Sequence, residues 1–260
     1  MGRALITGAS SGLGAEFAWI LAAEQNDLVL VARSEDRLQE LAHDLRQLAG
    51  VRVEVLPADL ATDEGIAAVS TRLEDTASPI TLLVNNAGMG LGQDFVTGSA
   101  QREEHVERVM VRAVMLLSQA AARAMVARGR GTIINVASIT SMTVQGTYSA
   151  HKAWVKVFTE GLAADLAGTG VNATVVLPGL MHTEFHERSH VDSSQWAEAT
   201  FLPVDKVVRA TLDAARRGKV VVVPGALYKL TYGALKFAPR SLVRFFAGPK
   251  LSGRTAGIPE

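Results

Sequence analysis

The sequence predicts one α/β domain with a doubly wound, mostly parallel sheet of seven strands and helices on both faces. Short apolar runs alternate with longer amphipathic runs along the 260 residues, as strands alternate with helices in such folds. The runs at 28–31 and 220–223 are apolar at every position, which indicates strands buried on both faces of a parallel sheet. We expect the domain over residues 1–251, including a C-terminal helical segment at 225–248, followed by a tail at 252–260.

The spacing of apolar residues assigns each element in order. Seven strands are predicted at 3–7, 27–32, 51–56, 80–84, 131–137, 171–177 and 219–223. Seven longer helices are predicted at 12–25, 34–48, 62–77, 100–128, 147–168, 204–217 and 226–237. Two shorter helices are expected, one within 183–199 and one over 240–247, beyond Pro239.

The composition excludes several classes of function. The chain has 26 Lys and Arg against 26 Asp and Glu, whereas a nucleic-acid binder would carry an excess of basic residues. Without cysteine there can be no disulfide, thiolate metal site or cysteine nucleophile. No uncharged apolar run reaches the roughly 18 residues of a membrane-spanning helix, and a strand that starts at Arg3 leaves no room for a signal peptide. We therefore expect a cytoplasmic protein that acts on a small molecule.

A glycine-rich loop joins the first predicted strand to the first predicted helix. Glycines at such a place allow a sharp turn and a close approach to a pyrophosphate, whose charge is stabilised at the N-terminus of a helix. The spacing is G-x-x-x-G-x-G and not the commoner G-x-G-x-x-G, so a plain glycine turn is the alternative. The strand before the loop and the helix after it favour a dinucleotide site, formed by Gly8, Ser10, Ser11, Gly12, Leu13 and Gly14.

The end of the second predicted strand bears on the choice between NADP and NAD. An NAD site would carry an acid there to hold the 2′-hydroxyl of the ribose, but the chain has Ala32 and Arg33. An arginine can pair with a 2′-phosphate, so the sequence favours NADP over NAD. The alternative is that Arg33 is only a solvated residue and that Glu35 or Asp36 serves the ribose.

Small and polar residues follow three further strands. Asp59-Leu60 is suited to a hydrogen bond with the amine of an adenine. Asn85-Asn86-Ala87-Gly88 suits a loop that closes over a ribose, with its amides satisfying backbone groups. Pro178-Gly179 ends the sixth strand sharply, and the hydroxyl of Thr183 could reach a carboxamide. Each segment could be a simple turn, but ligands of such sheets bind at the carboxyl ends of the strands.

A tyrosine and a lysine four residues apart stand in the predicted helix 147–168. At this spacing Tyr148 and Lys152 leave the same face of the helix, one turn apart. An ammonium group favours the phenolate, which makes the phenol a better proton donor near neutrality. Ser138 ends the fifth strand at the same edge of the sheet as the glycine loop.

Taken together and in this order, these motifs resemble the short-chain dehydrogenase/reductase family over about residues 3–225. The resemblance implies a Rossmann-type fold and hydride transfer between a nicotinamide and a carbonyl carbon. It implies that Tyr148 gives or takes the proton of the substrate oxygen and that Ser138 hydrogen-bonds this oxygen. Lys152 would bind the ribose hydroxyls of the nicotinamide half and lower the pKa of Tyr148. A homodimer or homotetramer would be the assembly.

The chain departs from the family pattern at two places. The family carries an asparagine in its long fourth helix, where it helps to hold a water in the proton relay behind the lysine. Met110 occupies that place, and the predicted helix 100–128 contains no asparagine. A methionine cannot replace the amide, so the relay is built differently, the enzyme is slow, or it is not an oxidoreductase. The loop 139–147 is also shorter than usual, which would open or reshape the pocket.

The histidine repeat after the sixth strand and the C-terminal segment are both open to more than one interpretation. His182, His186 and His190 repeat every four residues and could bind a metal on a helix, but we expect no metal because they follow Pro178-Gly179, where the family has a flap over the substrate. The residues expected to line the substrate pocket are Met89, Leu91, Phe95, Val144, Met181 and Phe185.

The predicted segment 225–248 is apolar with scattered cations. It could lie on a membrane surface, or pack on the substrate pocket or on a neighbouring subunit; of these we favour packing.

The leading hypothesis is an NADP(H)-dependent oxidoreductase that acts on a carbonyl or secondary alcohol of an apolar substrate. The rival is a nucleotide-binding regulatory or scaffold protein of the same fold with little or no turnover, which Met110 and the short loop motivate. An isomerase or dehydratase of the same fold is a third interpretation.

Overall fold

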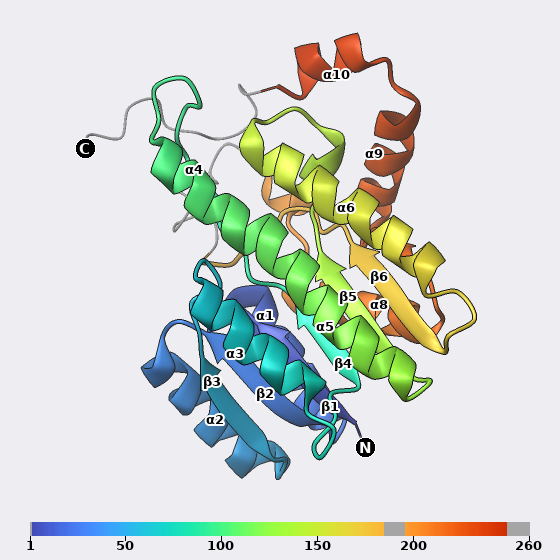
Figure 1. The fold of residues 1–260 in the computed structure, drawn as a ribbon. Coiled ribbons are helices and arrows are strands. Elements are labelled where there is room, and N and C mark those ends of the chain that lie inside the picture. The colour runs from blue at the N-terminus through green and yellow to red at the C-terminus, as the bar shows by residue number, and fades with distance from the viewer. Residues whose placement is uncertain (1, 185–195, 249–260) are drawn as a thin grey trace.

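A seven-stranded sheet forms the centre of the computed structural model, which describes residues 2–184 and 196–248 (Figure 1). The strand order is β3-β2-β1-β4-β5-β6-β7, and every neighbouring pair is parallel. This confirms the predicted fold class, and the order reverses between β1 and β4, where such sheets open a crevice for ligands. The strands are Arg3–Thr7 (β1), Asp27–Ala32 (β2), Val53–Pro57 (β3), Leu82–Asn85 (β4), Gly131–Val136 (β5), Val171–Val176 (β6) and Val221–Val222 (β7).

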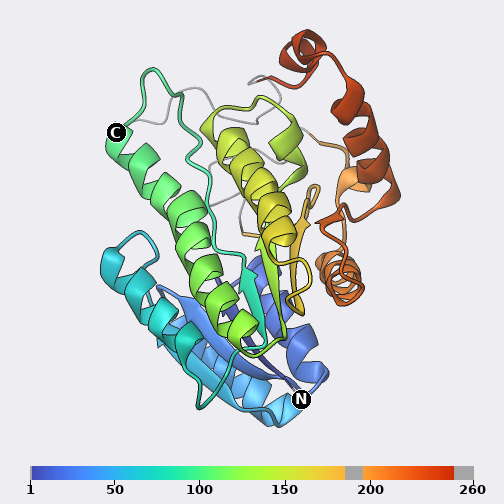
Figure 2. The same cartoon turned by 45° about the vertical axis from the view of Figure 1, so that its right-hand side comes forward.

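Helices cover both faces of the sheet, as Figures 1 and 2 show. Adjacent strand residues point to opposite faces, so Leu5 packs with α3 and α5 while Ile6 packs with α1, α2 and α8. Both faces are therefore apolar, which explains the strands without alternation. The helices of one face are Gly12–Ala23 (α1), Glu35–Ala49 (α2) and Val204–Arg216 (α8), and those of the other are Asp63–Glu74 (α3), Ala113–Ala127 (α5) and Thr147–Asp165 (α6).

The helix predicted at 100–128 is divided by a π-helical turn. It consists of α4 (Ala100–Glu107), the turn Arg108–Arg112 and α5. By length and composition, the stretch from Ala100 to Ala127 could cross a membrane, but half of its most apolar window is buried inside the fold. It packs on α3 and on the sheet, so it is a core helix of this fold.

Other boundaries also differ from the prediction. The strands β3 and β4 begin two residues later than predicted, and β7 is limited to two residues because it pairs only with the end of β6. Within the predicted loop 139–147, Ile139–Met142 forms a 3₁₀ turn. The short helix predicted within 183–199 falls mostly on residues outside the described ones; Glu198–Thr200 forms a 3₁₀ turn.

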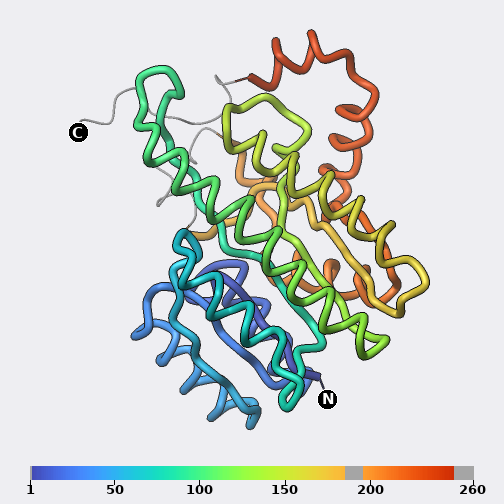
Figure 3. The backbone as a smooth tube through the Cα atoms, in the orientation of Figure 1, coloured from blue at the N-terminus to red at the C-terminus, as the bar shows by residue number. Residues whose placement is uncertain are grey.

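The C-terminal helices stand beyond the carboxyl ends of β5 and β6 (Figures 1 and 3). They are α9 (Ala226–Phe237) and α10 (Arg240–Phe246), close to the predicted bounds. The hydroxyl of Tyr228 donates to the oxygen of Thr200 at 2.8 Å and accepts from the nitrogen of Leu180 at 3.0 Å. A Cβ atom at Gly179 would lie 2.0 Å from the Tyr228 ring, so only glycine lets α9 pack this closely.

Candidate active site

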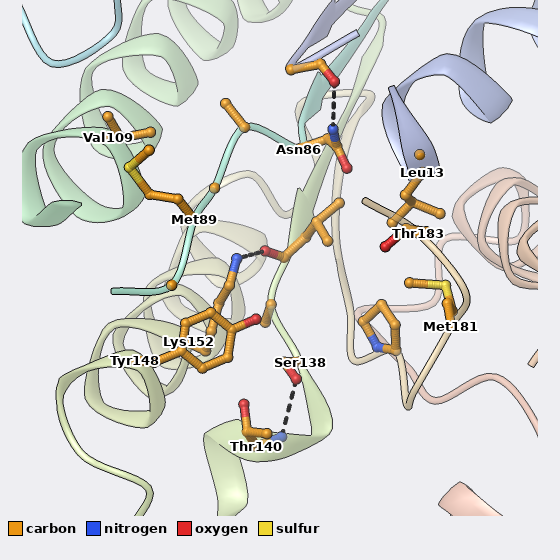
Figure 4. Close-up of a pocket in the computed structure, with 18 of the residues that line it drawn as sticks. Leu13, Asn86, Met89, Val109, Ser138, Thr140, Tyr148, Lys152, Met181 and Thr183 are labelled. Carbon is orange, nitrogen blue, oxygen red and sulfur yellow. Dashed lines mark hydrogen bonds between the residues drawn. The ribbon is translucent and has the colours of Figure 1, made fainter. Parts of the chain in front are cut away.

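A cavity of about 1100 Å³ lies at the carboxyl edge of the sheet, between the glycine loop and α6 (Figure 4). It brings together nearly all of the residues that the sequence marks as functional. Among the predicted catalytic and cofactor-binding residues, Gly14 is the exception, because it does not line the cavity. The predicted residues that do line it are Gly8, Ser10, Ser11, Gly12, Leu13, Arg33, Asp59, Leu60, Asn86, Ala87, Gly88, Ser138, Tyr148, Lys152, Pro178, Gly179 and Thr183.

Gly14 acts on the shape of the glycine loop instead of facing the cavity. A Cβ atom at this position would lie 2.2 Å from the oxygen of Gly8 and 2.5 Å from Nδ2 of Asn86. Asn86 Nδ2 donates to the oxygens of Thr7 and Gly8 at 3.0 and 3.2 Å, and so holds the loop from the other side (Figure 4). As predicted, an amide after β4 satisfies backbone groups. The N-terminus of α1 lines the cavity and is accessible to a bound group.

The neighbouring Asn85 belongs to a buried polar network below the site. Its Nδ2 donates to Oγ of Ser118 at 3.1 Å and to Oδ1 of Asn135 at 2.9 Å. Asn135 Nδ2 donates in turn to Oγ1 of Thr159 at 2.9 Å. All four side chains are buried, so this network fixes β4, β5, α5 and α6 relative to one another under the site. Ser118, Asn135 and Thr159 could not be predicted as a set, because no spacing rule connects them.

Ser138, Tyr148 and Lys152 meet on the other side of the cavity (Figure 4). Ser138 follows β5, and its Oγ accepts from the nitrogen of Thr140 at 3.2 Å, which starts the 3₁₀ turn. The Ser138 hydroxyl also hydrogen-bonds the phenol of Tyr148. Nζ of Lys152 lies 5.9 Å from the centre of the Tyr148 ring, as expected for residues one helical turn apart.

The pKa of Tyr148 is raised, and burial is its main cause, so the expected effect of Lys152 on this pKa stays a prediction. Burial raises the pKa of Tyr148 to about 12, and the hydrogen bond from Ser138 only partly opposes this. Burial also lowers the pKa of Lys152 to about 8, because the side chain is only 5% exposed. Loss of hydration disfavours the charged form of each group, which raises the pKa of the phenol and lowers that of the ammonium group. At neutral pH the phenol therefore keeps its proton.

Met110 lies behind Lys152, at the place expected from the sequence. It is 1% exposed, and its Cγ lies 4.0 Å from the position that a Cβ atom of Gly88 would take. Nζ of Lys152 lies 3.4 Å from that same position. The partner of the ammonium is the main-chain oxygen of Val136, at 2.8 Å (Figure 4). The hydrogen bond behind Lys152 is thus made to a strand end and not to a side chain of the long helix.

The adenosine side of the cavity carries a residue that the sequence analysis missed. Arg37 lies in the first turn of α2, four residues after Arg33, and both line the cavity. Its guanidinium group makes two hydrogen bonds, of 3.1 and 2.7 Å, to the carboxylate of Glu184. The signal that could have found Arg37 is a second arginine at the start of the helix that follows β2, close to the expected place of a 2′-phosphate. Asp59, predicted to bind adenine, accepts a hydrogen bond of 3.0 Å from the nitrogen of Ala61 through Oδ1.

The substrate side of the cavity agrees with the prediction in part. Met89, Leu91 and Met181 line it. Phe95 is 65% exposed and does not line the cavity, nor does Val144, while Phe185 lies outside the described residues. Ile139, from the loop that was expected to shape the pocket, also lines the cavity. Tyr228, Thr231 and Leu235 show that the segment 225–248 packs on the cavity, which is one of the two packing modes favoured from the sequence. Trp196, which also lines the cavity, was not predicted.

The histidine repeat is only partly described. His182 pairs with Glu198 at 2.8 Å, and its ring stacks on Phe201 with 4.0 Å between the centroids. His186 and His190 lie outside the described residues. Within residues 2–184 and 196–248, no three His, Asp or Glu residues are grouped as metal ligands.

Known proteins resemble this chain in sequence and in fold. A family model described as short chain dehydrogenase matches residues 3–193. Ketoacyl reductase HetN from Nostoc sp. is 34% identical over 178 residues, which is 67% of this chain and 62% of that protein. A short-chain dehydrogenase from Sphingobium yanoikuyae in complex with NADPH has a TM-score of 0.85 and 35% identity, with coverage of 100% of this chain and 99% of the other.

A second solved structure is similar over almost the same length. The bulky-bulky ketone specific alcohol dehydrogenase from Comamonas testosteroni has a TM-score of 0.78 and 31% identity, and the match covers 93% of this chain and 96% of the other. The family model covers most of the chain, and these neighbours share its sheet. The protein therefore belongs to the short-chain dehydrogenase/reductase family of nicotinamide-dependent oxidoreductases.

Proposed function

We propose that this enzyme transfers a hydride between NADP(H) and a carbonyl or secondary alcohol of an apolar substrate. The observation that carries the proposal is that two groups of residues meet in one cavity. Ser138, Tyr148 and Lys152 line one side, and the glycine loop with Arg33 lines the other. Carbonyl reduction requires a positioned proton donor beside a bound dinucleotide, and one cavity with both groups supports this function.

The residues that line the cavity support NADP as the cofactor. The glycine loop brings the N-terminus of α1 to the cavity, which suits a pyrophosphate. Arg33 and Arg37 place two guanidinium groups near the end of β2, where a 2′-phosphate would lie. The NADPH in the Sphingobium yanoikuyae relative supports the same choice. NADPH, when bound, would supply the hydride.

The side chains of the catalytic group would handle the proton. Tyr148 would give its proton to the substrate oxygen, because its raised pKa keeps the phenol protonated at neutral pH. Ser138, which already hydrogen-bonds that phenol, would donate to the same substrate oxygen and fix its position. Lys152 would hold the ribose hydroxyls and place a positive charge beside the phenol as the proton leaves. Oxidation of an alcohol would use the same groups in reverse.

The lining of the cavity supports a bulky apolar substrate. Met89, Leu91, Ile139, Met181 and Leu235 line the same cavity as the proton donor. Apolar walls with a few convergent polar groups are typical of sites that orient an apolar ligand by one functional group. The bulky-bulky ketone specificity in the name of the Comamonas testosteroni relative supports the same size class.

Consumption of NADPH with a panel of ketones tests the proposal. Ketones with two bulky apolar substituents are expected to react faster than acetone-sized ones. Tyr148→Phe is expected to lower kcat by about 10²- to 10⁴-fold, which is the usual contribution of a general acid, while NADPH still binds. Arg33→Ala is expected to raise the Kd for NADPH by about tenfold or more and to leave the Kd for NADH unchanged.

The results separate this function from the rival. NADPH binding by fluorescence or calorimetry, without turnover that depends on Tyr148, would support a regulatory or scaffold protein of the same fold. Equal loss of NADPH and NADH affinity in Arg33→Ala would contradict the preference for NADP. Arg209→Ala, an exposed arginine of α8 away from the cavity, is the matched control and should change neither constant.

We also propose that the enzyme is a homodimer or homotetramer. Met115, Val126 and Val157 on α5 and α6 are 41%, 39% and 64% exposed, and exposed apolar residues on two long helices support a helix-to-helix interface. Light scattering of the purified chain measures its mass; a monomer at micromolar concentration would contradict the proposal.

A further inference from the structure

Helix α9 presents apolar residues to the cavity and to solvent. Tyr228, Thr231 and Leu235, spaced three and four residues apart, line the cavity. Leu230 and Phe237 lie on another side of the same helix and are 74% and 82% exposed. A helix that only covered the cavity would be polar on its outer side. The outer side of α9 therefore needs its own explanation.

Helix α10 extends this exposed apolar surface. Val243 is buried, but Leu242, Phe245 and Phe246, at positions i, i+3 and i+4, are 50%, 81% and 66% exposed. The two phenylalanine rings meet edge to face with 4.9 Å between their centroids. Figures 2 and 3 show both helices at the outer edge of the molecule. We define the C-terminal face as the exposed residues Leu227, Leu230, Phe237, Leu242, Phe245 and Phe246.

Cations without acids accompany the C-terminal face. Lys229, Lys236, Arg240 and Arg244 are all exposed on the same two helices. No Asp or Glu occurs anywhere in residues 214–259, although the whole chain has 26 basic and 26 acidic residues. Leucine and phenylalanine beside lysine and arginine form the pattern of helices that lie in the interface of an anionic bilayer.

We propose that the C-terminal face binds the surface of an anionic lipid bilayer. The apolar side chains enter the boundary of the acyl chains, and the four cations contact the lipid headgroups. A second copy of the chain fits less well, because a two-fold contact through this face would bring the same four cations together without any acid. The charge of the face therefore selects an anionic surface.

The C-terminal face is joined to the loop in front of the proton donor. Nη1 of Arg240 donates to the oxygen of Met142 at 3.2 Å, and the nitrogen of Val144 donates to the oxygen of Ala247 at 3.2 Å. Both hydrogen bonds fasten α10 to the loop 139–147, and α9 lines the cavity itself. A bilayer bound to this face therefore lies next to the catalytic cavity, where an apolar substrate concentrated in lipid is close to its site. The lipid contact itself does not depend on the proposed function.

Vesicle flotation with the full chain tests the lipid contact. The probes are vesicles of phosphatidylcholine alone and of phosphatidylcholine with phosphatidylglycerol. The protein is expected to float with the anionic vesicles only, and added salt should release it. The double variant Phe245→Ser/Phe246→Ser is expected to lower the partition coefficient by about tenfold or more, since it removes two apolar side chains from the interface. Lys229→Gln/Lys236→Gln should reduce binding to the anionic vesicles by a similar factor.

Matched variants elsewhere serve as controls. Leu48→Ser changes an apolar residue of α2 that is 77% exposed, and Lys206→Gln/Arg209→Gln removes two exposed cations of α8. These controls should bind vesicles like the unchanged chain, and every variant should keep its Tm because the altered side chains are exposed.

Three outcomes would overturn the proposal. The first is no flotation with anionic vesicles. The second is flotation that the C-terminal variants do not reduce. The third is that the unchanged chain does not bind vesicles and that Phe245→Ser/Phe246→Ser has a different oligomeric mass. This result would assign the C-terminal face to a contact with a second copy of the chain. None of these measurements requires turnover, so failure here leaves the proposed function standing.

Discussion

The ammonium group of Lys152 donates a hydrogen bond of 2.8 Å to the main-chain oxygen of Val136, the last residue of β5. This bond holds a positive charge in a place that is only 5% exposed, where burial lowers the pKa of Lys152 to about 8. The phenol beside it has a pKa of about 12. Of the two groups, the lysine is therefore the one that titrates close to physiological pH.

The first prediction concerns the pH dependence of ketone reduction. Lys152 carries its charge below its pKa of about 8 and loses it as the pH rises, while Tyr148 keeps its proton until about 12. We expect kcat/KM for reduction to be level near neutrality and to fall above about pH 8. Steady-state rates from about pH 6 to about pH 10 measure this. A level profile up to about pH 10 would show that the lysine charge does not matter for reduction.

The second prediction concerns the stability of Lys152→Met. The folded-state pKa is lowered from 10.5, so burial of the charge costs stability below about pH 8, and this cost disappears as the pH rises toward 10.5. A pKa shift from 10.5 to about 8 corresponds to roughly 3 kcal/mol of stability, which the variant gains because it has no buried charge. The oxygen of Val136 loses its hydrogen bond in the variant, and this offsets about 1–3 kcal/mol of the gain. The variant is expected to be inactive, and at pH 7 equal to or up to about 2 kcal/mol more stable than the unchanged chain.

Urea unfolding at several pH values checks this second prediction. The stability of the variant relative to the unchanged chain should decrease between about pH 8 and about pH 10, as the unchanged chain loses its buried charge. If the free energy of unfolding of the variant is several kcal/mol lower than that of the unchanged chain at pH 7, Lys152 stabilises the fold and the prediction is wrong. Val155, an apolar residue of the same helix that is 1% exposed, gives the control for packing, because Val155→Ala removes buried side-chain volume without a change of charge.

The third prediction concerns the ion pair between Arg37 and Glu184. In this structure the Glu184 carboxylate takes two hydrogen bonds from the guanidinium group that would otherwise be available to a 2′-phosphate. Glu184→Gln is therefore expected to tighten NADPH binding by about threefold to tenfold, and Arg37→Gln to weaken it by a similar factor. Both effects are modest because the two side chains are 41% and 43% exposed. Calorimetry with NADPH and NADH measures them; equal changes for both nucleotides would rule out competition with the phosphate.

The fourth prediction compares two Gly→Ala substitutions. At Gly14 the new Cβ atom would lie 2.2 Å from the oxygen of Gly8, so the glycine loop must shift and both nucleotide affinity and stability should fall. At Gly161, in α6, nothing lies within 4 Å, so alanine should stabilise the fold by about 0.5–1 kcal/mol. Thermal unfolding and NADPH titration separate the two. Normal NADPH binding by Gly14→Ala would mean that close packing of α1 on the loop is not required.

The sheet and the order of the motifs could be read from the sequence. Strands β1 and β2 have the predicted bounds, because their apolar runs are buried between two layers of helices. Helix α9 also has the predicted bounds, because its apolar residues repeat at helical spacing. The glycine loop and the Tyr148–Lys152 pair are also local features. Their chemistry follows from residue type and spacing, and the fold carries both to the same cavity.

The direction of the pKa shift at Tyr148 depends on the packing of the whole fold. A spacing of four residues indicates that a lysine is near, but it does not tell how much water surrounds the two groups. That depends on distant segments that close around them, and the resulting burial raises the pKa of Tyr148. The ion pair of Arg37 with Glu184 joins residues 147 positions apart, and the buried network of Asn85, Ser118, Asn135 and Thr159 joins four elements. Such contacts have no sequence signal, because they arise when separate elements pack.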